Sequence, residues 1–170
     1  MALQFERPVI LDTTPLANHV RARLPEAEFI NLTPPDIDPD MMRSALRRAH
    51  AIVNPSNLPL TTAMLDEAIH LKIVANVARG YDNIDPVDLT RRGVWATNVP
   101  DAFTVPTAEV TIGLLLMVAR HLERGAATVR RGGWLTVVPG EWDGFSLAGK
   151  TLGIVGYGQI GQGFDLWPGN

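Results

Sequence analysis

The sequence contains no cysteine, so disulfide bonds, thiolate metal sites and a cysteine nucleophile are all excluded. Its 15 lysine and arginine residues are outnumbered by 18 aspartate and glutamate residues, which argues against a nucleic-acid partner. The N-terminal stretch lacks a basic segment followed by a long apolar core, so we expect no signal peptide and a cytoplasmic protein. The most apolar stretch, residues 110–119, is shorter than the about 20 residues that cross a bilayer, so no membrane partner is expected.

Other kinds of site also lack the residue patterns that they need. The four histidines share no ligand spacing, so we predict no metal site. No serine lies in a nucleophile-elbow sequence, which gives no basis for a serine hydrolase. The four tryptophans are not interleaved with basic residues, which argues against binding of single-stranded nucleic acid. A length of 170 residues suits one core, or one domain and part of another.

Short apolar runs alternate with helical patterns over the first hundred residues. The runs predict strands at residues 8–11, 28–32, 51–53, 71–75 and 94–97. Helix starts are indicated by a capping residue beside proline at Thr14-Pro15, Asp38-Pro39 and Asp85-Pro86, and by Thr61 or Thr62. Gly93 suits the left-handed position after a helix end. Strands separated by helices pair in parallel, so we predict an α/β fold with a flavodoxin-like, doubly wound domain over residues 1–100.

The rest of the chain has a different pattern. A long helix is predicted from Thr104 to about Arg124, and because it is apolar almost all round, we expect protein to cover both of its sides. Residues 125–147 are predicted to be irregular, with a packing role. A strand at residues 152–155 then opens a second βα unit. These features divide the chain into a first domain, an interdomain helix with a connecting arm over residues 101–150, and the start of a dinucleotide-binding domain over residues 151–170.

A glycine motif follows the last predicted strand. It runs Gly156-Tyr157-Gly158-Gln159-Ile160-Gly161. In a dinucleotide-binding turn the first glycine makes the tight turn, the second lets the backbone approach a pyrophosphate, and the third permits close packing of helix on strand. The spacing therefore predicts that this motif is a cofactor-binding segment, and a plain glycine-rich turn is the alternative.

The stretch from Leu147 to Gly161 closely resembles the cofactor-domain entrance of the NAD(P)-dependent D-2-hydroxyacid dehydrogenases. Upstream motifs match that family in the same order, and the resemblance covers roughly residues 50–162. The upstream motifs are Gly80-Tyr81-Asp82-Asn83-Ile84-Asp85, Arg92-Gly93-Val94, Thr97-Asn98-Val99-Pro100, Thr107-Ala108-Glu109 and Arg131-Gly132-Gly133-Trp134.

The resemblance implies an NAD- or NADP-dependent oxidoreductase that passes a hydride between the nicotinamide and a small 2-keto or 2-hydroxy acid. It implies that the loop after the fourth strand, Val77-Ala78-Arg79-Gly80, offers backbone N–H groups to the substrate carboxylate, and that Thr107 approaches the cofactor. It also implies a homodimer in which the long helix packs at the interface. The alternatives are a simple crossover turn at Gly80 and a helix-capping role for Thr107.

Arg79 adds a second possible substrate. Phosphite dehydrogenases resemble this chain in placing a cation, in their case lysine, before a Gly-aromatic-Asp-Asn sequence. A guanidinium group can clamp a carboxylate or a phosphite through two hydrogen bonds, whereas an ammonium group acts as a point charge. Phosphite is therefore an alternative substrate, although Val137 and Val138 stand where the phosphite enzymes have an aromatic residue.

The resemblance also stops within this chain. The family's catalytic arginine, glutamate and histidine lie beyond the glycine motif, and no position here corresponds to them, so we predict no catalytic residue in this chain. After Gln162 the sequence departs from the family pattern, and its glycines and proline should sustain no more than a turn of helix. We therefore expect a truncated relative that is inactive alone, with a non-enzymatic dimerisation or binding module as the alternative.

Overall fold

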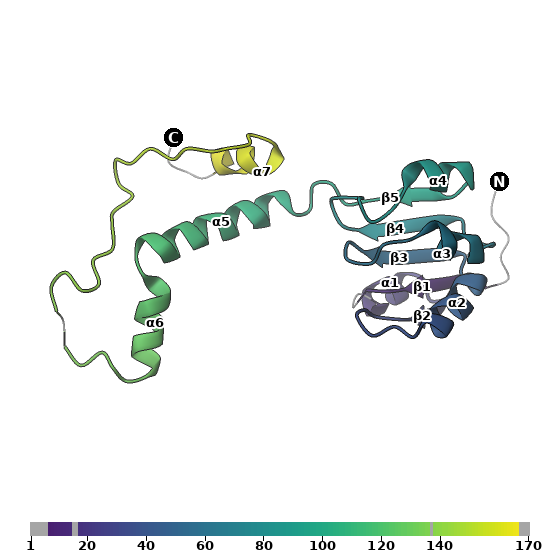
Figure 1. Ribbon diagram of the computed structural model, residues 1–170, viewed down its shortest axis with the longest axis horizontal. Helices are drawn as coiled ribbons and strands as arrows, with labels where there is room; N and C mark the ends of the chain where they lie inside the picture. The colour runs from purple at the N-terminus through teal and green to yellow at the C-terminus, as the bar shows by residue number, and fades with distance from the viewer. Residues whose placement is uncertain (1–6, 15–16, 137, 167–170) are drawn as a thin grey trace. The chain divides into compact units, whose positions relative to one another are not determined.

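Five parallel strands form the sheet that the sequence predicts. They are β1 (Val9–Asp12), β2 (Glu28–Asn31), β3 (Ala51–Pro55), β4 (Ile73–Val77) and β5 (Trp95–Thr97). The computed structural model describes residues 7–14, 17–136 and 138–166. Within the sheet the strand order is β2-β1-β3-β4-β5, and all four neighbouring pairs are parallel (Figure 1).

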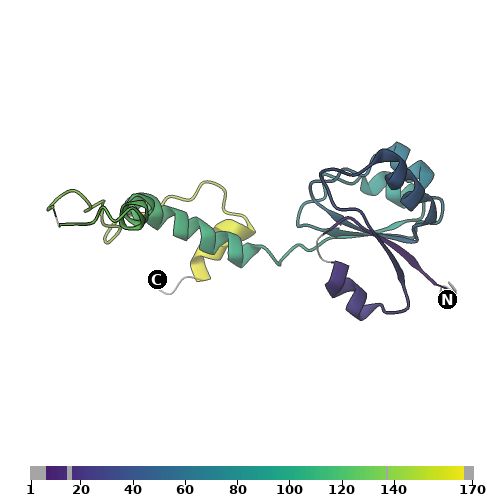
Figure 2. The same cartoon turned by 90° about the horizontal axis from the view of Figure 1, so that it is seen from below.

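Helices cover both faces of this sheet. The connections between the strands are α1 (Ala17–Arg23), α2 (Pro39–Arg48), α3 (Thr62–Glu67) and α4 (Pro86–Arg91). Figure 2 shows α1 on one face and the other three helices on the opposite face. The reversal arises because the chain moves outward from β1 to β2 and then crosses back to β3, and right-handed crossovers in opposite directions put helices on opposite faces. The predicted doubly wound α/β domain is confirmed.

Local capping chemistry accounts for where these helices begin and end. Asp38 Oδ1 accepts hydrogen bonds from the N–H groups of Asp40 at 2.8 Å and Met41 at 3.0 Å. Thr61 and Asp85 cap α3 and α4 in the same way. Gly93, after α4, has a φ of +69°, the left-handed conformation predicted for it. The fourth predicted cap, Thr14-Pro15, includes Pro15, which lies outside the described residues.

Strand alternation builds two apolar layers of unequal size. Leu11, Ile52 and Val74 lie in register across three strands, and all three are fully buried against the α2, α3 and α4 side. The opposite face is buried by a smaller cluster around Ile10 and Val53, beneath α1. The larger layer therefore supplies most of the hydrophobic stabilisation of the first unit, residues 1–101.

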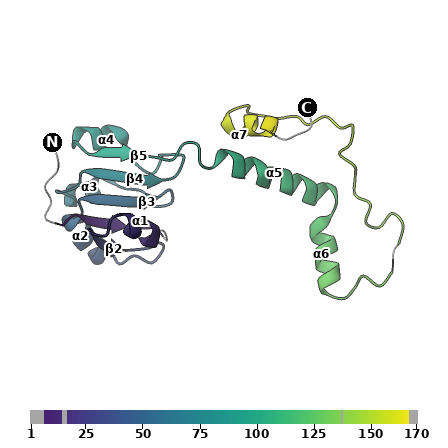
Figure 3. The same ribbon diagram turned by 180° about the vertical axis from the view of Figure 1, so that it is seen from behind.

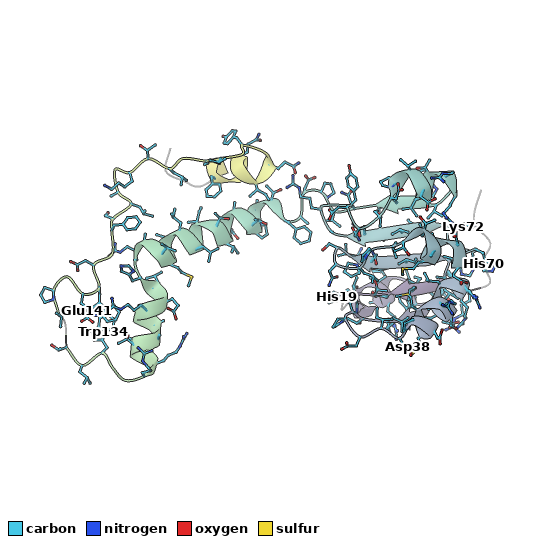
Figure 4. The ribbon with its side chains drawn as sticks, in the orientation of Figure 1. His19, Asp38, His70, Lys72, Trp134 and Glu141 are labelled. Carbon is cyan, nitrogen blue, oxygen red and sulfur yellow. The ribbon has the colours of Figure 1, made fainter. Side chains whose placement is uncertain are left out.

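His50 ties three strands together at the amino-terminal edge of the sheet. Its backbone N–H donates to Val9 O at 2.8 Å, its carbonyl accepts from Lys72 N at 2.9 Å, and its Nδ1 accepts from Val9 N at 3.1 Å. The imidazole stacks on His70 with ring centroids 5.9 Å apart, and Figure 4 shows His70 close to Lys72. Burial, His70 and Lys72 all lower the pKa of His50, with burial the largest cause.

This geometry predicts a pH-dependent stability. The pKa of His50 is lower in the folded than in the unfolded chain. The neutral imidazole therefore contributes to the free energy of unfolding at any pH above the pKa of the unfolded chain, and this contribution is lost as the pH falls through the pKa of the folded chain. Protonation of Nδ1 also removes the acceptor for Val9 N–H. Between pH 7.5 and pH 5, urea unfolding should show wild type losing about 1 kcal/mol more stability than His50→Asn, which keeps an acceptor but does not titrate. Parallel stability curves for the two proteins would contradict this.

The predicted long helix is wrong as a single element. The second unit, residues 102–170, contains α5 (Thr104–Ala119) and α6 (Leu122–Arg130), which meet at an angle of 71°. His121 takes a left-handed φ of +52°, and the carbonyl of Ala119 accepts from Phe145 N at 2.8 Å. A carbonyl that accepts a loop N–H while the backbone turns left-handed ends the helix there. Among the described residues no single helix is long and apolar enough to cross a membrane, although the bent pair passes that test together.

The arm after α6 has the packing role that the sequence predicts. Trp134 stacks on Trp142 with ring centroids 5.7 Å apart, and the Arg124 guanidinium carbon lies 4.5 Å above the centroid of Trp142. Glu141 pairs with Arg124 at 3.3 Å, and Figure 4 shows Glu141 beside Trp134. The arm is thus held against α6 by stacking and an ion pair, although α6 occupies residues 125–130 of the stretch that we predicted to be irregular.

Within the described residues of the second unit, only one face of α5 is covered. Ala108 and Ala119 are buried, and Thr111 and Leu115 line a hollow shared with residues 152–156. The expectation that protein covers both sides is therefore met on one side by the described residues of the second unit. The other face is exposed at Val110 (63%), Leu114 (56%), Met117 (40%) and Val118 (69%).

The predicted strand at residues 152–155 is also wrong. These residues form no strand, and Val155 is fully exposed. A strand needs a neighbour for its hydrogen bonds, and within the described part of the second unit no strand is present to pair with it. The chain instead runs into α7 (Gln159–Gln162) and a 3-10 turn at Gly163–Leu166, which Figure 3 shows beside α5. The short 3-10 turn agrees with the expectation that the tail after Gln162 sustains no more than a turn of helix, and the last residues of this tail, 167–170, lie outside the described part.

Candidate functional site

The principal candidate site is the loop that follows β4 at the carboxyl edge of the sheet, called here the 78–80 loop (Ala78–Gly80). Val77 ends β4 beside Pro55 of β3, half-buried. Ala78 is buried, Arg79 is half-buried and Gly80 is exposed. The sequence-predicted substrate residues therefore lie at the edge where ligands of parallel α/β sheets bind.

All three carbonyl groups of the 78–80 loop accept hydrogen bonds from β4 or from the segment after β5. Val99 N donates to Ala78 O at 2.9 Å, Asn98 Nδ2 donates to Arg79 O at 2.7 Å, and Asn76 Nδ2 donates to Gly80 O at 2.8 Å. The loop is thus anchored on the segment after β5 and on β4 itself. Anchored carbonyls restrict rotation of the peptide planes that carry them, so the loop has a defined backbone direction.

Buried asparagines support this anchoring. Asn76 and Asn83 exchange two amide hydrogen bonds, Asn83 Nδ2 to Asn76 Oδ1 at 2.9 Å and Asn76 Nδ2 to Asn83 Oδ1 at 3.2 Å. Asn83 Nδ2 also donates to Pro55 O at 3.1 Å, which joins the loop after β4 to the end of β3. Asn83 stands in one of the family motifs, but the sequence predicted no supporting role for either asparagine. Their positions on either side of a predicted binding loop, Asn76 near the end of β4 and Asn83 in the segment before α4, are the signal that could have identified them.

A hollow lies near the loop, although none of residues 77–80 lines it. This hollow of about 250 Å³ is lined by Tyr81, Ile84, Pro86, Ala96, Thr97 and Asn98. A Cβ at Gly80 would lie 2.8 Å from Asp82 Oδ1, so a larger residue there would have to displace the exposed Asp82 side chain. Arg79 supplies a cation at the middle of the loop, flanked by backbone that can donate hydrogen bonds. The arrangement suits a small anion held by N–H groups and a guanidinium.

The glycine motif at residues 156–161 forms a second candidate site, in the second unit. Gly156 has a φ of +91°, and a Cβ at Gly161 would lie 2.5 Å from Gly156 O, so both positions require glycine. Gly158 precedes α7 and accepts from Gln162 N at 2.8 Å, while Tyr157 O accepts from Gln162 Nε2 at 3.3 Å. The motif therefore makes a genuine tight turn.

The elements that would complete a dinucleotide site do not surround this turn. The residues before it are not a strand, and the helix after it has four residues, too few for an N-terminal anion site. Thr107 lies exposed in the first turn of α5, and its N–H donates to Phe103 O at 3.1 Å. The capping position of α5 is Phe103, with no side-chain hydrogen bond, so a capping role for Thr107 is wrong. The described residues alone do not fit a bound dinucleotide.

Metal-ligating residues are scattered. Among the residues that the structure describes, no group of three histidine, aspartate or glutamate side chains could hold a metal ion. His19, on α1, and His70, at the opposite edge of the sheet, illustrate this separation in Figure 4.

Comparison with known proteins gives a consistent result. Residues 9–159 match the model for the D-isomer specific 2-hydroxyacid dehydrogenase catalytic domain. A glyoxylate reductase from Pyrococcus furiosus is 40% identical over 131 residues, which span 75% of this chain and 39% of that enzyme. A glyoxylate reductase from Thermococcus litoralis is 43% identical over 122 residues, which span 69% and 37% of the two chains. The chain thus spans about two fifths of the length of these curated relatives.

Solved structures show the same extent of similarity. An NADPH-dependent glyoxylate/hydroxypyruvate reductase from Sinorhizobium meliloti, crystallised with NADP and malonate, is 32% identical with a TM-score of 0.72. The match covers 94% of this chain and 49% of that enzyme. A protein from Thermus thermophilus matches at 29% identity and a TM-score of 0.81, over 92% and 51% of the two chains.

Proposed function

Because the chain belongs to the D-isomer specific 2-hydroxyacid dehydrogenase family, we propose that its first unit is the substrate-binding part of an NAD(P)-dependent oxidoreductase acting on a small 2-hydroxy or 2-keto acid. The observation that carries this proposal is that all three carbonyl groups of the 78–80 loop accept hydrogen bonds from the protein, which fixes the direction of the backbone. Its N–H groups and Arg79 would hold the substrate carboxylate. The relatives named as glyoxylate reductases support an acid of this size.

Binding of a small 2-hydroxy acid to the full chain tests this function. Glycolate and its uncharged amide, glycolamide, differ only in the carboxylate that the loop would recognise. At ten times its Kd, glycolate should stabilise the chain by about 1.4 kcal/mol and raise Tm by about 4 °C, at ionic strength matched with sodium chloride. Glycolamide should leave Tm unchanged. Equal shifts with both compounds, or none with either, would refute the proposed carboxylate site.

Phosphite is the second candidate anion, and Arg79 is the residue that suggests it. A guanidinium group pairs with tetrahedral oxyanions as well as with carboxylates. The same thermal measurement with sodium phosphite separates the two substrate classes, because a 2-hydroxy acid enzyme should be stabilised by glycolate at concentrations where phosphite has no effect. Stronger stabilisation by phosphite would assign the phosphite chemistry instead.

NAD or NADP is the proposed cofactor of the complete enzyme, in which it accepts or supplies the hydride. Within this chain the glycine motif and Thr107 are the residues that would approach it. Since the described residues do not build a strand and a sustained helix around the motif, we predict that the 170-residue chain alone neither binds NADH tightly nor reduces glyoxylate. Titration of NADH fluorescence should show no saturation below about 1 mM. A micromolar Kd or measurable turnover would contradict this prediction.

A homodimer is the proposed assembly, and the uncovered face of α5 supports it. Val110, Leu114 and Val118 recur every four residues on one side of the helix and stay exposed. A contiguous exposed apolar stripe of this kind favours association with a second copy. We propose the cytoplasm as the location, where the nicotinamide coenzymes and small organic acids of this chemistry are found.

A further inference from the structure

The hydrogen bonds to the carbonyl groups of the 78–80 loop also determine the direction of its N–H groups. Each peptide plane contains the C=O of one residue and the N–H of the next, and the two point in opposite directions. In a trans peptide the carbonyl of one residue and the N–H of the following residue are antiparallel. A donor that fixes a carbonyl therefore also fixes where the next N–H points. This inference rests on the proposed function, since it concerns the same loop.

In this loop, each hydrogen bond to a carbonyl group sets the direction of one backbone N–H group. Val99 N holds Ala78 O, so the N–H of Arg79 points away from Val99. Asn98 Nδ2 holds Arg79 O at 2.7 Å, so the N–H of Gly80 points away from Asn98. Asn76 Nδ2 holds Gly80 O at 2.8 Å and directs the N–H of Tyr81 in the same manner.

We propose that Asn98 and Asn76 are positioning residues that aim the backbone N–H groups of Gly80 and Tyr81, respectively, at the substrate carboxylate, with Asn83 holding the Asn76 amide in the required orientation. The two reciprocal bonds between Asn76 and Asn83 leave one amide orientation that still donates to Gly80 O. Neither Asn98 nor Asn76 touches the substrate in this arrangement; each acts through the backbone.

Donation to a carbonyl also strengthens the N–H on the same peptide. Hydrogen bonds in a chain polarise one another, so the Asn98 bond makes the Gly80 N–H a better donor to an anion. Asn98 is exposed, whereas Asn76 and Asn83 are buried. Asn98 can therefore be substituted with little loss of core packing, which makes it the position of choice for a test.

The test uses the full chain and the variant Asn98→Ala, with Asn57→Ala as the control, because Asn57 is also an exposed loop asparagine. Glycolate affinity and the residual dipolar coupling of the Gly80 N–H are measured by NMR, and Tm is measured in parallel. In Asn98→Ala the Kd for glycolate should rise about fivefold and the Gly80 coupling should change, while Tm stays within about 2 °C of wild type. Asn57→Ala should match wild type in all three.

The outcomes separate the positioning role from the proposed function. If wild type binds glycolate and Asn98→Ala binds it equally well with an unchanged Gly80 coupling, the positioning role is wrong and the carboxylate site stands. If wild type does not bind glycolate, the proposed function is wrong. If the Gly80 N–H coupling is also unchanged in Asn98→Ala, the positioning role is wrong as well. Asn76→Ala provides a second variant, in which the Tyr81 N–H coupling should change in samples that remain folded.

Discussion

Arg79→Glu is expected to weaken glycolate binding at least about 30-fold, because the variant replaces a charge-assisted hydrogen-bond donor with a carboxylate that repels the ligand. Arg79 is the cation of the 78–80 loop, and its backbone carbonyl is fixed by Asn98 at 2.7 Å, so the substitution changes the charge while the loop keeps its anchor. Arg79→Lys keeps the charge but loses the two-pronged geometry, so it should cost about fivefold. Isothermal titration calorimetry of the full chain measures all three values.

Arg23→Glu is the matched control for that substitution. It makes the same change in net charge within the same unit, at an exposed position at the end of α1. It should leave the Kd for glycolate within about twofold of wild type at an ionic strength of about 0.15 M, where distant surface charges are largely screened. If the two variants weaken binding equally, the effect is one of overall charge and Arg79 has no specific role.

Val110→Lys/Leu114→Lys is expected to convert the chain from a dimer to a monomer. Both side chains are more than half exposed on the uncovered face of α5. Burying each against a second copy would contribute about 1.5 kcal/mol, so placing two ammonium groups there should raise the dimer dissociation constant about 100-fold or more. Light scattering after size exclusion at about 20 µM protein should give the monomer mass.

Ile69→Lys/Val87→Lys provides the comparison for the dimer test. These two apolar residues are at least as exposed as Val110 and Leu114, but they lie in the first unit. This variant carries the same added charge and should remain a dimer. A monomeric wild type, or dissociation in both double variants, would show that the α5 face is not the dimer interface.

Local chemistry explains why the first unit could be predicted so closely. Its strands are short apolar or alternating runs, and Asp38, Thr61 and Asp85 cap helices with side-chain hydrogen bonds that need no distant partner. Gly93 likewise takes its left-handed conformation for a reason contained in its own backbone. Signals that depend on a few neighbouring residues are the ones that a single sequence reveals.

The errors in the second unit have non-local causes. Nothing near His121 in the sequence marks a break, because the Ala119 carbonyl is taken by Phe145, which lies 26 positions later. The run Leu152–Val155 has a strand's composition but no strand to pair with among the described residues of its unit. Helix continuation and strand formation at these places depend on contacts that local patterns do not encode.

Only part of the candidate site could be predicted, because the rest of it depends on contacts between residues far apart in the sequence. Residues 77–80 follow from their place after a strand and from the family motif, and the structure puts them at the carboxyl edge of the sheet. The supporting asparagines were not identified, since Asn98 reaches Arg79 across 19 positions and Asn83 reaches Pro55 across 28. Long-range hydrogen bonds of this kind require the fold before their partners can be named.

A residue-resolved titration tests the central claim most directly, namely that the 78–80 loop holds the carboxylate of a small 2-hydroxy acid. The backbone amide resonances of the full chain would be followed by NMR as glycolate is added, with glycolamide in a parallel sample. We expect saturable downfield shifts that are largest at the N–H groups of Arg79 and Gly80 and absent with glycolamide. Saturable shifts centred elsewhere on the chain, or no difference between the acid and its amide, would contradict it.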